Sequence, residues 1–180
     1  MPTADVSVRV AWSQDAAGIA SVQLRAWQQR YDALLPQLLA ERGLDPETHA
    51  AAWEQSLARP PEARHRALVA LERNLVVGFV LTGPATDPDA DPVVDGELGE
   101  FTVDPGHLRQ GHGSRLLQAA VDTLLADGFT RVACWIDSTD DDARAFLSGA
   151  GWAPDGASRE LADETGAGTV KQVRLHTAIA

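Results

Sequence analysis

A glycine-rich turn lies between an apolar run and an amphipathic segment in the second half of the chain. From Val103 to Leu117 the sequence reads VDPGHLRQGHGSRLL. The apolar run ends at Asp104-Pro105-Gly106, and Leu and Val recur at helical spacing over Ser114–Ala126. This pattern predicts a strand that leads into a helix N-terminus, where N–H groups without partners inside the helix can bind phosphate oxygens. Gly111 and Gly113 have no Cβ to obstruct such a ligand.

Two other phosphate-binding motifs fit these residues less well. A P-loop has Lys and then Ser or Thr directly after its last glycine, but Ser114 and Arg115 follow Gly113. A dinucleotide fingerprint requires a third glycine at position 116, which is Leu116. ATP and NAD are therefore disfavoured as ligands.

The run resembles the acetyl-CoA loop of GNAT-type N-acetyltransferases, in which a strand ending in valine and proline leads to (Arg/Gln)-x-x-Gly-x-Gly/Ala. Leu108 occupies the Arg/Gln place, and the basic residue follows at Arg109. Main-chain amides make most of such a site, so this departure removes no essential contact. The resemblance implies acetyl-CoA as co-substrate, without a metal. It would be bound by Phe101, Thr102, Val103, Leu108, Arg109, Gln110, Gly111, His112, Gly113, Ser114, Asp140, Arg144 and Phe146.

Composition restricts the class of protein. A chain of 180 residues suits one domain spanning residues 1–180 with its own core. Fifteen Lys and Arg against 26 Asp and Glu give a formal charge of −11, which argues against nucleic acid or an anionic membrane as partner. The single Cys134 lies in an apolar run and is expected to be a buried thiol. No signal peptide or membrane-spanning stretch is evident, which predicts a cytoplasmic protein.

Hydrophobic periodicity and turn residues predict the order of the elements. Strands are expected at 6–10, 66–71, 75–82, 97–103, 131–136 and once or twice after Trp152. Helices are expected from residues 13–15 to before Pro36, over 38–59 with a break near 43–46, over 114–126 and over 140–149. This order resembles the GNAT fold over nearly the whole length, and residues 19–36 resemble its first helix. The resemblance implies an α/β (α+β) fold with a mixed central sheet flanked by helices, in which the parallel strands 97–103 and 131–136 splay apart.

Two acidic or histidine-containing regions could suggest metal sites. The segment 83–96 carries four aspartates interrupted by prolines and lacks an EF-hand pattern, so it is interpreted as an exposed, irregular loop. His107 and His112 flank the glycine-rich turn without further ligands, and we expect both to be exposed to solvent.

The chemistry implied by the resemblance requires an amine without its extra proton. Neutralising an amine of pKa near 10.4 at pH 7 costs about 4–5 kcal/mol, so a carboxylate or a water chain must take that proton. Glu97 matches a position where relatives often carry Glu and is the first candidate, followed by Glu100; either could instead be a solvated strand residue. The main-chain N–H at Val103 would donate to the thioester oxygen.

Two further positions concern the leaving group and the acceptor. The family's usual tyrosine acid falls at Leu147, with Asp140 at the place of an Asn. A thiol of pKa near 8.5 leaves as thiolate at pH 7 for only about 2 kcal/mol, so this loss should slow catalysis modestly. Trp27 and Tyr31, four residues apart on one helix face, pack in the core or form an aromatic wall for the acceptor.

The sequence thus predicts an N-acetyltransferase that transfers acetyl from acetyl-CoA to a primary amine of a small molecule or peptide in a ternary complex. A non-catalytic acyl-CoA-binding or regulatory module is the alternative, for which Leu147 is the best argument. A domain without CoA affinity is a third interpretation. Proteins that resemble this one are often dimers, so a homodimer is possible.

Overall fold

The computed structural model describes residues 5–31, 45–162 and 168–180. Its elements are, in chain order, β1 (Val6–Val10), η1 (Ser13–Asp15), α1 (Ala16–Arg30), α3 (Pro46–Ala58), β2 (Arg66–Glu72), β3 (Leu75–Pro84), β4 (Asp95–Val103), η2 (Pro105–His107), α4 (His112–Ala126), β5 (Arg131–Asp137), α5 (Asp141–Gly149), β6 (Ala153–Ala162) and β7 (Thr169–Ala178). The expected end of the first helix and the start of the second, at 38–44, lie outside the described residues.

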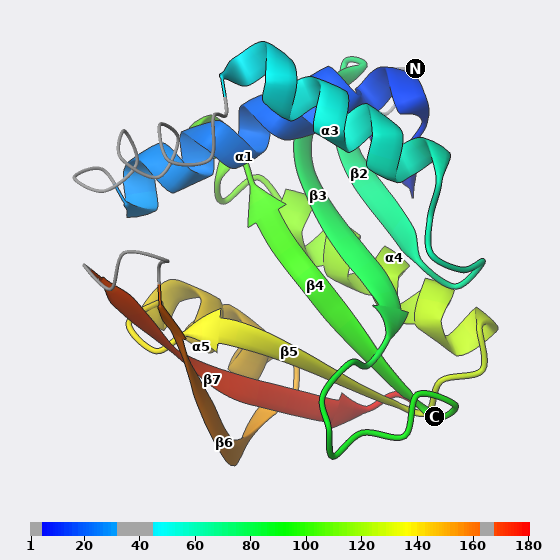
Figure 1. The fold of residues 1–180 in the computed structure, drawn as a ribbon, viewed down its shortest axis with the longest axis vertical. Coiled ribbons are helices and arrows are strands. Elements are labelled where there is room, and N and C mark those ends of the chain that lie inside the picture. Colours follow the sequence, from blue (N-terminus) through cyan, green and yellow to red (C-terminus); the bar gives the residue numbers. More distant parts are fainter. Residues whose placement is uncertain (1–4, 32–44, 163–167) are drawn as a thin grey trace. The chain divides into compact units, whose positions relative to one another are not determined.

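Within these residues, seven strands form a mixed sheet in the order β1-β2-β3-β4-β5-β7-β6 (Figure 1). β4 and β5 are parallel, whereas the β1–β2, β2–β3, β5–β7 and β6–β7 pairs are antiparallel. The ladder between β4 and β5 runs from Asp95–Arg131 to Leu98–Cys134, although both strands continue beyond it. The predicted mixed sheet with flanking helices is confirmed.

The described residues form two compact units. The first extends to Thr82 and includes Glu100–Thr123, and the second comprises Gly83–Gly99 and Leu124–Ala180. β3 and β4 each contribute residues to both units.

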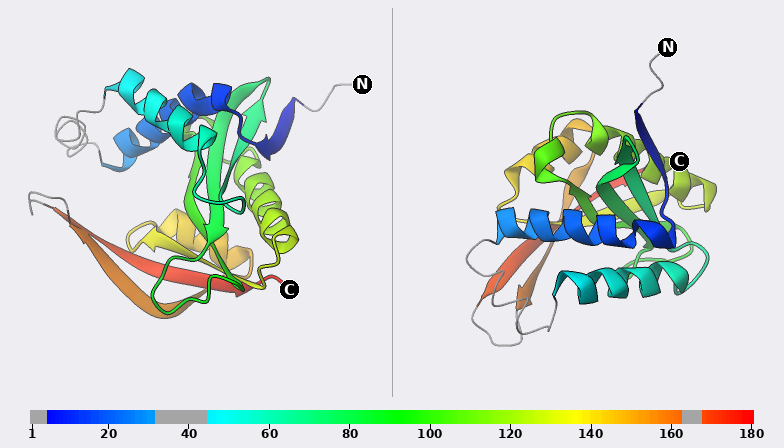
Figure 2. Two further views of the ribbon diagram at one scale, coloured as in Figure 1. Left: turned by 45° about the vertical axis from the view of Figure 1, so that its right-hand side comes forward. Right: turned by 90° about the horizontal axis from the view of Figure 1, so that it is seen from above.

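In the first unit, α1 and α3 lie side by side (Figures 1 and 2) and cover one face of β2 and β3. Their shared core consists of the fully or nearly buried residues Ile19, Val22, Val69, Leu71, Val76 and Phe79, against which Ala11, Trp53 and Leu57 pack. Trp53 of α3 meets Phe79 edge to face, with ring centroids 5.3 Å apart. Helix α4 covers the opposite face, where Leu116 packs against Gly78.

In the second unit, β5, β7 and β6 form an antiparallel group with α5. Its buried residues include Phe129, Val132, Cys134, Leu147, Trp152 and Leu175. Burial raises the pKa of the Cys134 thiol to about 12, so this cysteine is a neutral core residue, as the sequence predicted.

Three element boundaries around the acidic segment and the glycine-rich turn differ from the sequence-based expectation. The segment expected to be irregular over 83–96 is shorter, because β3 continues to Pro84 and β4 begins at Asp95. Helix α4 begins at His112 instead of Ser114, because the Gly111 carbonyl already accepts the Arg115 N–H at 3.1 Å.

Gly78 is the point where β3 leaves no room for a side chain. A Cβ there would lie 2.9 Å from the Thr102 carbonyl oxygen and 3.0 Å from Leu116 Cδ1. Because the carbonyl belongs to the backbone of β4, we expect Gly78→Ala to lower the free energy of unfolding by about 1–3 kcal/mol, measured by urea denaturation.

Gly149→Ala is the matched control, since a Cβ added at this position of α5 would have no atom within 4 Å. We expect this control to be neutral or slightly stabilising, because alanine favours a helix over glycine by roughly 0.5–1 kcal/mol. Equal urea midpoints for Gly78→Ala and the unchanged chain would contradict the close approach of β4 to β3.

Candidate functional site

Asp104 fixes the point where β4 ends. Its N–H donates to the Val77 carbonyl at 2.8 Å, and its carboxylate accepts the Gly106 N–H at 3.0 Å. Arg25 of α1 binds the same buried carboxylate, with Nη2 2.5 Å from Oδ2. Burial acts to raise the pKa of Asp104, but the hydrogen bonds from Arg25 and Gly106 outweigh it and lower the pKa below its ordinary value. The carboxylate therefore stays charged near neutral pH and anchors the turn after β4.

The glycine-rich loop, Leu108–Gly111, is exposed and leads directly into α4. Arg109 and Gly111 have φ angles of 60° and 84°, in the left-handed region that favours glycine. The N–H groups of the first turn of α4 have no acceptor inside the helix, and they lie at the positive end of the helix dipole. The loop and this helix end can therefore bind an anion such as a pyrophosphate.

His112, the first residue of α4, is buried, so the expectation that it is exposed is wrong. Its Nε2 lies 3.0 Å from Glu72 Oε2, and its Nδ1 lies 3.3 Å from Arg115 Nη2. A guanidinium can only donate, so Nδ1 accepts from Arg115 and Nε2–H donates to Glu72. Glu72 is 40 residues away in the chain, and no local pattern indicates this contact. His107 is half-buried, with Nδ1 3.7 Å from Asp104.

Glu100 is a partly buried carboxylate within β4. It accepts hydrogen bonds from the side chains of Gln23 and Trp27 on α1. Burial raises the pKa of Glu100, and the two hydrogen bonds and the nearby charge of Arg30 oppose the rise without cancelling it. A carboxyl with a raised pKa is a better proton acceptor than an ordinary one, so Glu100 has the properties of a general base.

Three residues around Glu100 were not identified from the sequence as functional. Gln23 is buried and binds His49 and Trp53 of α3, whose ring nitrogens Nε2 and Nε1 lie 2.6 and 2.9 Å from Gln23 Oε1. Burial lowers the pKa of His49, so its ring is neutral near pH 7. The signal that could have indicated Gln23 is its place in the apolar stripe of α1, four residues after the fully buried Ile19.

Glu97 lies in different surroundings. Its carboxylate accepts hydrogen bonds from Thr86, at 3.1 Å from the main-chain N–H and 3.2 Å from the hydroxyl. Further along β4, Thr102 is buried, whereas Phe101 and Val103 are half-buried.

The two aromatic residues predicted for the acceptor site lie at the end of α1. Trp27 is half-buried, and its ring centroid is 5.6 Å from that of His49. Tyr31 terminates the helix, with its N–H 2.7 Å from the Trp27 carbonyl and the Arg30 guanidinium 5.9 Å from its ring centroid. The Trp27 side chain also donates to Glu100, so it lies beside that carboxylate. Tyr31 lies one helical turn further along, at the end of α1.

The remaining candidates belong to α5 in the second unit. Asp140 is the N-cap of α5, and its carboxylate accepts the Ala143 N–H at 3.0 Å. Arg144 donates to the Ser138 carbonyl at 2.8 Å, and Phe146 is half-buried. Leu147, at the family's usual tyrosine place, is buried in the core.

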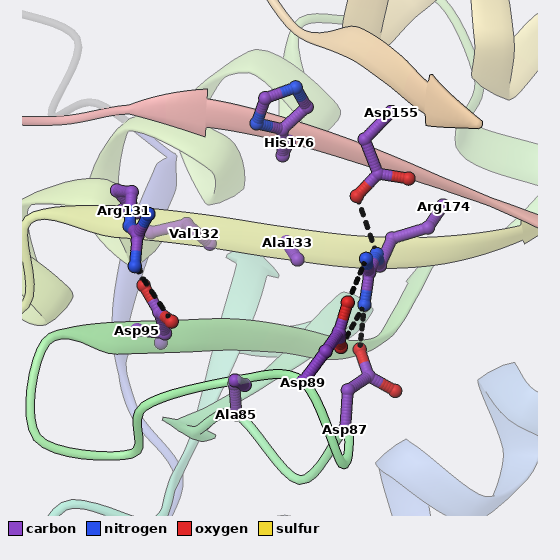
Figure 3. Close-up of a pocket in the computed structure, with 12 residues that line it drawn as sticks. Ala85, Asp87, Asp89, Asp95, Arg131, Val132, Ala133, Asp155, Arg174 and His176 are labelled. Carbon is purple, nitrogen blue, oxygen red and sulfur yellow. Dashed lines mark hydrogen bonds and ion pairs between the residues drawn. The ribbon is translucent and has the colours of Figure 1, made fainter. Parts of the chain in front are cut away.

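A cavity of about 170 Å³ lies in the second unit, among the loop after β3, β5, β7 and the start of β6 (Figure 3). Arg174 is its central residue, with guanidinium nitrogens 3.1, 2.7 and 2.6 Å from carboxylate oxygens of Asp87, Asp89 and Asp155. These bonds raise the pKa of Arg174 and keep it charged. The acidic loop is therefore held by an ion-pair network, which the sequence did not predict. None of the lining residues belongs to the glycine-rich loop or surrounds Glu100.

The part of the chain that the structure describes lacks two classes of feature. No three His, Cys, Asp or Glu side chains there are placed to share a metal ion. No helix in the described ranges combines the length and apolarity needed to cross a membrane.

Comparison with solved structures identifies the fold. The chain superposes on yncA of Salmonella typhimurium, an acetyltransferase-type protein solved with its cofactor acetyl-CoA, with a TM-score of 0.68 and 18% identity, covering 98% of this chain and 95% of that one. A ribosomal-protein-alanine N-acetyltransferase from Brucella melitensis gives a TM-score of 0.72 at 16% identity, covering 96% and 99%. At these identities the likeness shows the fold alone.

Comparison of sequences identifies the family. Mycothiol acetyltransferase of Kineococcus radiotolerans is 30% identical over 122 residues, which are 68% of this chain but 38% of that protein, so the chain spans well under half of this relative. The model of the acetyltransferase (GNAT) family matches residues 24–152, which include the C-terminal part of α1, Glu100, the glycine-rich loop and α5. On this match, the chain belongs to the GNAT acetyltransferase family.

Proposed function

We propose that this chain is an acetyl-CoA-dependent N-acetyltransferase, with residues 1–180 acting as one domain that acetylates a primary amine of a small molecule or peptide. One observation carries the proposal: β4 holds a partly buried carboxylate, Glu100, and leads at Asp104 into a loop and helix end suited to an anion. The proposed base, Glu100, and the proposed phosphate site at the start of α4 therefore lie close together along the chain.

The glycine-rich loop fits the pyrophosphate of acetyl-CoA. Its exposed residues and the first turn of α4 present main-chain N–H groups, and the exposed Arg109 adds a positive charge to an acidic protein. The structural relative yncA, solved with acetyl-CoA, supports this assignment. We extend it to Asp140, Arg144 and Phe146 as further contacts, on the resemblance to the family.

Acetyl-CoA, when bound, supplies a thioester whose carbonyl carbon is open to attack. Glu100 takes the proton that the acceptor's ammonium must lose, a deprotonation that costs about 4–5 kcal/mol for a lysine-like amine at pH 7. The amine nitrogen would then form its bond to the carbonyl carbon as the carbon–sulfur bond breaks. CoA would leave as its thiolate, and the second proton, which the new amide nitrogen loses, would pass to that thiolate. The N–H of Val103 donates to the carbonyl oxygen and stabilises the charge that develops there. In this proposal the transfer is direct, without an acetylated residue of the chain.

The acceptor would meet the wall formed by α1 and α3. Trp27 presents its indole ring beside Glu100, and an aromatic face next to a carboxylate suits a cationic amine. Relatives named for mycothiol and for ribosomal-protein alanine span the small-molecule and peptide classes. We therefore propose that the acceptor group is a primary amine, carried either by a small molecule or by a peptide.

Glu100→Gln tests the base. It keeps the shape of the side chain but cannot accept a proton, so kcat should fall about 10²–10⁴-fold while the Kd for acetyl-CoA stays unchanged. CoA release with spermidine, glucosamine and a peptide with an N-terminal alanine as acceptors measures turnover, and calorimetry measures binding. In the unchanged chain, kcat/KM should rise with pH as the Glu100 carboxyl, whose pKa burial raises, loses its proton.

Glu97→Gln is the matched control on the same strand. If Glu97→Gln abolishes turnover and Glu100→Gln does not, Glu97 is the base. If acetyl-CoA binds but the unchanged chain acetylates none of these amines, the acyl-CoA-binding module, which the buried Leu147 favours, replaces the enzyme as the proposed function.

Gly111→Ala tests the loop. Gly111 has a φ of 84°, and a Cβ there would lie 2.9 Å from Arg115 Nη1. A left-handed alanine costs about 1–2 kcal/mol, so the loop should leave this conformation and bind acetyl-CoA about tenfold or more weakly in calorimetry. Gly106→Ala, where the nearest atom is 3.6 Å from the added Cβ, should bind normally. Equal affinity of both variants would show that this loop does not hold the phosphates.

A further inference from the structure

Gln23 links the carboxylate of Glu100 to helix α3 through both ends of its amide. Its Nε2 donates to Glu100 Oε2. Its Oε1 lies 2.6 Å from His49 Nε2 and 2.9 Å from Trp53 Nε1. Gln23 itself is 4% exposed and His49 6%, so water has little access to either side chain. These hydrogen bonds thus connect α3, α1 and β4 through one buried amide, that of Gln23.

The chemistry of the two α3 donors fixes the orientation of this amide. An indole Nε1–H can only donate, so the atom of Gln23 that faces Trp53 must be the carbonyl oxygen. The same oxygen requires His49 to carry its proton on Nε2. With the oxygen held by two donors, the NH₂ group must point toward Glu100. A reversed amide would place its NH₂ against two N–H groups and its oxygen against a carboxylate, leaving buried polar groups unsatisfied.

We propose that Gln23 is a positioning residue, locked in one orientation by His49 and Trp53, which holds the Glu100 carboxylate ready to accept the proton of the acceptor amine. The proposal rests on the proposed function, which assigns that proton transfer to Glu100. Trp27 donates to the same carboxylate from one helical turn further along α1. Both of these donors to Glu100 therefore come from α1, and α3 acts on the carboxylate through Gln23.

The charged and titratable groups around Glu100 give this arrangement a measurable signature. On α1 the charge of Arg30 stabilises the carboxylate, and on α3 the neutral His49 faces it only across Gln23. Burial raises the pKa of Glu100, and the N–H donors Gln23 and Trp27 lower it. Loss of the Gln23 donor must therefore raise the pKa further.

Gln23→Met tests the proposal directly, because methionine has a similar length and no donor. Carbon-13 NMR of the side-chain carboxyl of Glu100, assigned with Glu100→Gln, measures its titration in the full chain. We expect the midpoint to rise by about one pH unit or more in Gln23→Met. Gln23→Glu, which keeps acceptors for His49 and Trp53, should raise it further, because two carboxylates then share the site. If Gln23→Met does not fold, the titration of Glu100 is measured in Gln23→Glu instead.

Gln29→Glu is the matched control, because it makes the same change at an exposed position of α1. It should leave the Glu100 midpoint within about 0.2 pH units, since exposed charges are well screened. An unchanged Glu100 midpoint in both Gln23 variants would overturn the proposal.

The NMR midpoint of Glu100 and the turnover measurements together distinguish a failure of this proposal from a failure of the proposed function. If the NMR midpoint rises and the acidic limb of kcat/KM moves up with it, Gln23 positions the base. If the midpoint rises but turnover is unaffected by Glu100→Gln, the positioning stands and the catalytic role of Glu100 fails. If turnover falls in the Gln23 variants with no change in midpoint, the role of Gln23 is structural and the proposal fails.

Discussion

Removing a carboxylate from water costs several kcal/mol unless N–H donors replace the lost hydration, and Glu100 imposes this requirement on the first unit of the protein. Its donors come from Gln23 and Trp27, one turn apart on α1. Helix α1 must therefore present two polar groups from the same stripe that buries Ile19 and Val22 in the core. The rotation of α1 about its axis must therefore satisfy these hydrogen bonds as well as the apolar packing of Ile19 and Val22.

The same helix also fixes the end of β4. Arg25 binds Asp104, and Asp104 in turn caps the turn before the glycine-rich loop. Arg25 lies between Gln23 and Trp27 in the sequence, so α1 holds the stretch of chain from Glu100 to Asp104 at both of its ends. The proposed base, Glu100, and the proposed phosphate loop would perform different tasks, but one helix contacts the chain at both places. If the proposed roles hold, a shift of α1 would disturb proton transfer and cofactor binding together.

The sequence predicted features that depend on neighbouring residues and missed those that depend on distant ones. Periodicity and turn residues located β1 to β5, α4 and α5 within two residues, whereas β6 and β7 were predicted only as one or two strands after Trp152. The run from Val103 to Leu117 indicated both the family and the loop. The burial of His112 depends on Glu72, and the role of Gln23 depends on His49, 26 residues later in the chain. Polar contacts of this kind leave no periodic pattern, and only a buried glutamine on an apolar stripe could have indicated them.

In the proposed reaction, the position of Leu147 bears on which of the two proton transfers needs a side chain of the protein. With a buried leucine in place of the usual tyrosine, the departing sulfur has no hydroxyl donor at that position. A CoA thiol of pKa near 8.5 can leave as thiolate at pH 7 for about 2 kcal/mol, whereas deprotonating the incoming ammonium costs about 4–5 kcal/mol. The larger cost falls on the base. In the proposed mechanism, the buried contacts of Gln23 with His49, Trp53 and Glu100 therefore serve the more demanding of the two proton transfers.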